Sequence, residues 1–190
     1  MRHKRLGRCL GRSSSHRRAL LRNMASALFL TERDAELDDN QPKVKGRIVT
    51  TIHKAKEVRP LVEKCITVAR RALASLDAAN QFATTADRGS EAWKAWRNSN
   101  QWQQWNQAIA PALAARRHAV QLLGDKQAVR ILFQDIAPRM ANRPGGYTRI
   151  VRLATPRVGD AGTRAILELV GVRDRVKAAK SEKFVDEDAS

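Results

Sequence analysis

Apolar residues recur every three or four positions between residues 16 and 32, which is the spacing of an amphipathic helix. A serine at position 13, 14 or 15 can cap the start of this helix by accepting a backbone N–H bond. Arginines fall mainly on the side away from the apolar stripe, so one face is expected to pack and the other to stay accessible. The stripe consists of Leu20 or Leu21, Met24, and Ala27 or Leu28.

A short β-branched run, RIVTTI at residues 47–52, predicts a strand. The residues after it carry a long apolar stripe at helical spacing, which predicts a helix to about residue 76. Because proline lacks a backbone N–H, Pro60 indicates that regular helix begins around Val58 or Arg59. The stripe consists of Val58, Leu61 or Val62, Cys65 or Ile66, Ala69, Leu73 and Leu76.

Residues 77–113 are rich in Ala, Asn and Gln and contain all four tryptophans. Trp102, Trp105 and Ile109 share a helical face, whereas Trp93 and Trp96 do not, so a break is expected near residues 98–100. The pattern predicts an inserted helical hairpin. Its tryptophans can stack on unpaired bases or pack within the protein, and the scarcity of nearby arginines favours packing or a protein contact.

The remaining pattern predicts a helix, a basic turn and two strands. Helical spacing resumes over residues 115–140, with a possible interruption at Gly124 and Asp125. The turn DIAPRMANRPGG at residues 135–146 combines helix-stopping prolines with glycines and arginines. The runs 147–154 and 163–170 are strand-like, and a glycine-containing connection of this length predicts antiparallel pairing.

Charge changes the interpretation of this pattern. Lys and Arg number 36 against 19 Asp and Glu, giving a net charge of +17 and an isoelectric point near 11.1. Such an excess favours a polyanionic partner, which can be RNA, DNA or an anionic membrane. The membrane is the weakest candidate, because the chain has no long apolar run and its basic amino-terminal residues include no aromatic anchors.

Residues 1–12 contain five basic side chains and no acidic one, so this arm is expected to stay disordered until it meets a polyanion. A charge run can also be a merely solvated surface. Here arginine outnumbers lysine and alternates with glycine and serine, which favours bidentate phosphate contacts. Arg139 and Arg143 in the basic turn form a second candidate phosphate clamp. Lys54 and Lys56 fit a phosphate contact and an ordinary lysine surface equally well.

Common catalytic and metal-binding patterns are missing from the sequence. There is no G-x-S-x-G or H-E-x-x-H motif, and the GDK at residues 124–126 lacks the rest of a phosphate-binding loop. His3, Cys9 and His16 lie close in sequence, but without a C-x-x-C pair they do not indicate a zinc site. We therefore expect no enzyme activity, no metal, no cofactor and no small-molecule substrate.

The Arg- and Ser-rich start of the chain also fits an organelle transit peptide.

Three long strings carry a family resemblance: MRHKRLGRCLGRSSSHRRALLRNMASAL, TTIHKAKEVRPLVEKCITVAR and LFQDIAPRMANRPGGYTRIVRLATPRVGDAGTRAILELV. In this order they resemble the bacterial large-subunit ribosomal protein family L-seventeen. The resemblance starts at Met1, which argues against a transit peptide. It implies a non-catalytic structural constituent of the ribosome that binds large-subunit ribosomal RNA in the cytoplasm, with ribosomal protein L-thirty-two as a neighbour.

The resemblance also implies a fold: an α/β (α+β) domain of two layers, in which helices cover a three-stranded mixed sheet. We expect a basic RNA-binding arm at residues 1–12, one globular domain at 13–171 and a mobile tail at 172–190. Within the domain, segments of about 33–46 and 75–113 look longer than in the usual family member and are interpreted as insertions. Their partners do not follow from the sequence.

The residues expected to contact RNA combine the basic arm with the later basic positions. They are Arg2, His3, Lys4, Arg5, Arg8, Arg12, Ser15, His16, Arg17, Arg18, Arg22, Asn23, Lys54, Lys56, Arg139, Arg143, Gly145, Gly146 and Arg149. Two other functions were weighed. A free-standing DNA-binding regulator or chromosome-compacting protein would need a recognition helix that is not evident, and an RNA-processing enzyme would need catalytic motifs.

Overall fold

The computed structural model describes residues 7–35 and 38–171. The expectations for residues 1–6 of the arm and for the tail at 172–190 lie outside these ranges. Helix α1 spans Ser14–Leu30, as the apolar pattern predicts, but no serine side chain caps it. Its buried face includes Ala25, Leu28 and Phe29, whereas Ala27 is exposed. Of the two residues that the sequence offered for the apolar stripe, Leu28 is therefore the buried one.

Strand β1, Arg47–Thr51, leads directly into helix α2, Ile52–Asn80. The prediction that regular helix begins near Val58 was wrong, because Pro60 lies inside an unbroken helix. Pro60 is exposed, while Val58 and Val62 on the opposite side are fully buried. The packing of this apolar face holds the helix through the proline, whose missing N–H costs less at the surface than in the core.

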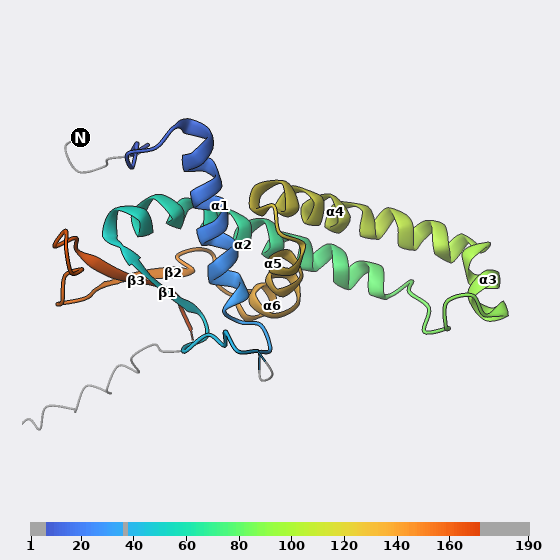
Figure 1. Ribbon diagram of the computed structural model, residues 1–190. Coiled ribbons are helices and arrows are strands. Elements are labelled where there is room, and N and C mark those ends of the chain that lie inside the picture. Colours follow the sequence, from blue (N-terminus) through green and yellow to red (C-terminus); the bar gives the residue numbers. More distant parts are fainter. Residues whose placement is uncertain (1–6, 36–37, 172–190) are drawn as a thin grey trace, which may run out of the picture.

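Helix α3, Glu91–Arg97, and helix α4, Asn100–Leu123, form the expected hairpin with the second half of α2. The predicted break is confirmed at Asn98 and Ser99. Helices α2 and α4 lie side by side, and α3 sits at the end of the molecule farthest from the sheet (Figure 1). The hairpin therefore projects from the body of the protein.

A left-handed residue separates α4 from the helices that follow. Gly124 ends α4 with φ 75°, and the Asp125 carboxylate then accepts hydrogen bonds from the N–H groups of Gln127 and Ala128. This cap starts α5, Lys126–Ile131, which continues through a π-helical turn, η1, Leu132–Ile136, into α6, Ala137–Arg139. The predicted interruption at Gly124 and Asp125 is confirmed.

Strands β2, Thr148–Arg152, and β3, Arg164–Leu169, complete a sheet of order β1-β3-β2. The α+β class is confirmed, but the sheet is antiparallel and not mixed. Strands β1 and β2 run in the same direction, but they are not neighbours, because β3 lies between them and pairs antiparallel with both. The expected antiparallel pairing of the last two strands is confirmed.

One face of the sheet is covered and the other is open. Leu167 is fully buried and stands in register with Ile48 and Ile150, on the face that packs against α2. Val49 and Val151, one position along, are exposed on the opposite face. Within the described residues no helix is long and apolar enough to cross a membrane.

Candidate nucleic-acid interface

The described part of the arm forms a tight turn before α1. Gly7, Leu10 and Gly11 all have positive φ, and the guanidinium of Arg12 donates to the carbonyl of Leu10 at 2.7 Å. Arg8 lies 3.9 Å from the Glu57 carboxylate of α2. The turn therefore rests against the start of α2, while Arg2, His3, Lys4 and Arg5 lie outside the described residues.

The predicted basic face of α1 borders a surface cavity of about 360 Å³. Among the described residues its lining includes no acidic one, and it brings four predicted positions together with the end of α4. Arg22 donates to the carbonyl of Gln121 at 2.7 Å, and Ser26 donates to that of Leu123 at 3.3 Å, which joins the two helices. The lining consists of Ser15, Arg18, Ala19, Arg22, Asn23, Leu123 and Gly124.

His16 and Arg17, also predicted, do not line this cavity. His16 is exposed and Arg17 is half-buried. Leu123 and Gly124 were not among the expected contacts. They could not be found from the sequence, because only the crossing of α1 with α4 brings them beside the arginines.

Lys54 and Lys56 differ in their surroundings. Lys54 is half-buried and lines a cavity of about 530 Å³ at the end of the sheet, whereas the exposed Lys56 does not line it. They lie two positions apart on a helix, which turns their side chains about 200° from each other. The arginines beside Lys54 are Arg157 and Arg164, which sequence reasoning did not select.

Arg157 is paired with Asp160 across the turn between β2 and β3. Its hydrogen bonds hold the pKa of the Asp160 carboxyl well below its usual value, and the N–H of Gly162 contributes to the same shift. Asp160 therefore remains charged at neutral pH and offsets part of the positive charge of this cavity.

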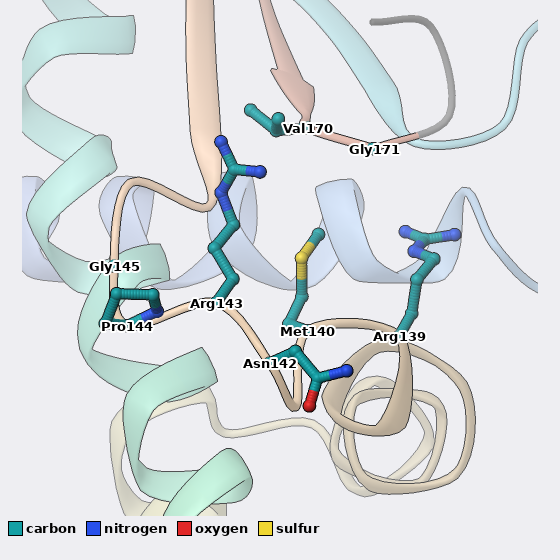
Figure 2. A pocket seen from close by; sticks show the side chains of 8 residues that line it. All are labelled: Arg139, Met140, Asn142, Arg143, Pro144, Gly145, Val170 and Gly171. Atoms are coloured by element: carbon teal, nitrogen blue, oxygen red, sulfur yellow. The ribbon is translucent and has the colours of Figure 1, made fainter.

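The basic turn borders a pocket of about 510 Å³, shown in Figure 2. Arg139, Arg143 and Gly145 line it, as does the end of β3, while Gly146 does not. Arg139 is paired with Glu32 at 2.9 Å, and the Nε–H of Arg143 donates to the carbonyl of Gly146 at 3.2 Å. Both predicted arginines are therefore oriented by the fold.

Arg149 lies elsewhere, on the open face of the sheet. It stands in register with Glu168, which is only 6% exposed, and their closest approach is 2.7 Å. Arg47 on β1 contacts the same carboxylate at 3.1 Å. Glu168 thus balances charge in a row of side chains that crosses all three strands.

Sequence reasoning missed one further basic groove, between α4 and α5. The guanidinium of Arg116 lies over the Phe133 ring at 5.3 Å, beside Lys126 and Arg130. These residues are scattered over two helices, so no local run in the sequence reveals them. The described residues contain no cluster of three or more potential metal ligands.

Comparison with known proteins decides the family. The family model described as "Ribosomal protein L17" matches residues 20–170. The chain belongs to the ribosomal protein L17 family. This L17 family member is therefore a structural protein of the ribosome and not an enzyme.

Relatives of this L17 family member include proteins named "Large ribosomal subunit protein bL17". The one from Rhodopirellula baltica is 61% identical over 189 residues, covering 100% of this chain and 90% of the relative. The one from Desulfotalea psychrophila is 36% identical over 96% of this chain and 99% of the relative. The one from Syntrophotalea carbinolica is 34% identical over 98% of this chain and 87% of the relative.

Proposed function

We propose that this chain is a structural constituent of the large ribosomal subunit in the cytoplasm, where it binds and stabilises large-subunit ribosomal RNA. The observation that supports RNA binding best is the α1 cavity, in which Arg18 and Arg22 converge on the end of α4 with no acidic residue in the lining. Its relatives carry the large subunit in their names. A basic surface of this kind is suited to phosphate.

The proposed contacts are mainly to the RNA backbone. Guanidinium groups bind phosphate oxygens in a bidentate manner, and Ser15 and Asn23 add neutral hydrogen-bonding groups at the same cavity. Such a surface recognises A-form geometry more than base sequence. The arm at residues 1–12, whose residues 7–12 already form the turn before α1, is proposed to run along the RNA beside this cavity, with Arg2, His3, Lys4 and Arg5 among its contacts.

The proposal extends to the organisation of the chain and its neighbours. Residues 13–171 form one domain that the arm precedes and the tail follows, with insertions at about 33–46 and 75–113. Other large-subunit proteins, among them L-thirty-two, are the proposed neighbours. Chemical crosslinking of purified large subunits, followed by mass spectrometry, identifies those neighbours directly.

Binding of large-subunit ribosomal RNA at several salt concentrations tests the proposal. We expect log affinity to fall with log salt by roughly 0.7 to 0.9 for each phosphate contact. Arg18→Gln should weaken binding and reduce that slope by about one contact. Arg88→Gln is the matched control, because Arg88 is exposed in the loop before α3, and α3 lies far from α1 (Figure 1).

Two results would contradict the proposal. One is an affinity that does not depend on salt. The other is tighter binding to duplex DNA than to folded ribosomal RNA, which would favour the DNA-binding alternative.

A further inference from the structure

The pocket beside the basic turn has a composition that a phosphate contact does not require. It lies between the end of α6, the turn at residues 142–145 and the end of β3, and its volume is about 510 Å³. Figure 2 shows Arg139 and Arg143 on opposite sides, with Met140 between them and Asn142 nearby. Among the described residues no acidic side chain lines it, although Glu32 pairs with the lining Arg139 at 2.9 Å.

Its interior combines apolar and polar groups. Met140 is 2% exposed and Val170 is 7% exposed, and together with Pro144 they give the pocket an apolar lining. The side chain of Asn142 is exposed and offers both donors and an acceptor. A bare phosphate would gain nothing from the apolar lining, whereas a planar group could pack on it.

The fold holds the pocket in shape before any ligand arrives. The Glu63 carboxylate of α2 accepts hydrogen bonds from the N–H of Tyr147 at 3.1 Å and from the N–H of Thr148 at 2.9 Å. The Val170 N–H donates to the carbonyl of Tyr147 at 2.9 Å. These bonds hold the residues that follow the turn and join them to Val170 in the pocket lining, so binding requires little ordering of the protein.

We propose that this pocket receives a single unpaired nucleotide of the ribosomal RNA. Its base lies on the apolar lining and against the arginine planes, and its flanking phosphates meet the guanidinium groups. Unpaired bases are the part of RNA whose faces and edges are available to protein side chains, and they stack on arginine as well as on aromatic rings. The inference rests on the proposed function, and it adds that an unpaired nucleotide is one part of the RNA that the protein binds.

The chain offers a variant that fills the pocket without straining the backbone. Gly145 lines the pocket, and a Cβ added there meets no heavy atom within 4 Å. Its φ lies outside the left-handed region that would penalise a side chain. Gly145→Leu should therefore fold normally and occupy the space of the base. Ala141→Leu is the control, because Ala141 is exposed beside the pocket without lining it.

The experiment uses the full-length protein bound to large-subunit ribosomal RNA. Hydroxyl radicals report protection of the backbone, and base-specific reagents report protection of individual bases. We expect one or two unpaired bases to be protected by the wild type and by Ala141→Leu, and to become reactive with Gly145→Leu. The backbone footprint elsewhere should persist. Loss of one stacked base should weaken binding by about 5- to 100-fold.

A short synthetic RNA that spans the footprint gives the second measurement. Replacing the protected nucleotide with an abasic one should weaken binding of the wild type. The same replacement should not further weaken the binding of Gly145→Leu.

If the backbone footprint forms but no base is protected, or if Gly145→Leu leaves base protection unchanged, the inference is overturned while RNA binding stands. If Gly145→Leu instead lowers crosslinking to a neighbouring protein, the pocket takes protein. Absence of any footprint would overturn the proposed function itself.

Discussion

Glu63 joins the long helix α2 to the basic turn through three hydrogen bonds. Its Oε2 accepts from the N–H of Tyr147, and its Oε1 accepts from the N–H and the hydroxyl of Thr148 at 2.9 and 2.7 Å. Both carboxylate oxygens are therefore needed as acceptors. A single side chain fixes the place where the turn ends and β2 begins.

Glu63→Gln should destabilise the protein although it changes the size of the side chain little. One carboxylate oxygen becomes an NH₂ group, which then faces a backbone N–H donor with no acceptor between them. We expect the free energy of unfolding in urea to fall by about 1 to 3 kcal/mol. Glu91→Gln, at an exposed position and paired with Lys94 on the same helix, should change it by less than about 0.5 kcal/mol.

The two cysteines should differ in reactivity. Burial of the Cys65 thiol raises its pKa from 9.0 to about 12, an effect that Lys64 slightly offsets, whereas Cys9 is exposed. Since the thiolate is the reactive form, Ellman's reagent at neutral pH should modify one thiol of the native protein and two of the unfolded protein. Two equally fast thiols in the native protein would contradict the buried position of Cys65.

The same shift gives the sign of a pH effect on stability. The unfolded chain loses the Cys65 proton above its ordinary pKa of 9.0, while the folded chain keeps it until about 12. The contribution of this thiol to stability is therefore complete below about pH 9 and is lost as pH rises towards 12. Cys65→Ala should show a shallower alkaline decline.

At the scale of elements, the tryptophans stabilise the hairpin from within. The Trp96 indole donates to the carbonyl of Phe82 at 3.0 Å and packs edge-on against Trp105 with ring centroids 5.7 Å apart. Arg97 lies over the rings of Trp93 and Trp102 at 5.1 and 5.9 Å. These contacts agree with the packing interpretation of the tryptophans, since each ring has a partner within the hairpin.

Trp96→Ala should loosen the hairpin without unfolding the body. Hydrogen exchange is expected to accelerate over residues 82–105, while the amides of α1 and the buried half of α2 keep their protection. Trp93→Ala, which removes a cation–π contact with Arg97, should have a smaller effect. Faster exchange throughout the chain after Trp96→Ala would show that the hairpin supports the core.

The sequence predicted those elements whose signals are local. The break at Gly124 and Asp125 and the helical hairpin were evident, because glycine geometry, an aspartate cap and helical spacing act within a few residues. The start of α2 was predicted wrongly from Pro60, because the cost of a proline in a helix depends on which side of the helix is buried. The mixed sheet was wrong because strand order depends on β3 entering between two strands that are distant in sequence. Basic side chains were found where they cluster in sequence, and missed at Arg116 and Arg164.

At the scale of the whole molecule, positive charge is distributed over several separate surfaces. In the part of the chain that the structure describes, the α1 cavity, the basic turn and the groove beside Arg116 are each lined by Lys or Arg and by no acidic residue. Acidic partners occur where a cation is held for structural reasons, as Glu168 holds Arg47 and Arg149 and as Glu32 holds Arg139 at the edge of the basic turn. This distribution suits a protein that contacts RNA from more than one side.

Strand order also predicts how much of the chain is needed for a stable fold. A chain of residues 1–162 lacks β3 and with it the fully buried Leu167, so β1 and β2 have no strand to pair with. We expect this chain to keep much of its helical circular dichroism but to lose cooperative unfolding in urea. A chain of residues 1–171 should unfold cooperatively. Equal unfolding midpoints for the two chains would contradict this expectation.

The central position of β3 has a consequence for the time at which the protein matures. Among the described strands β3 is the last to be translated, yet both other strands pair with it. Helices formed from residues 14–139 can pack early, whereas β1 waits for a partner that follows it by more than a hundred residues. Until β3 leaves the exit tunnel, both edge strands stay open to wrong partners. Synthesis of β3 thus supplies the pairing partner of both other strands, and the residues directly after it complete the wall of the nucleotide pocket.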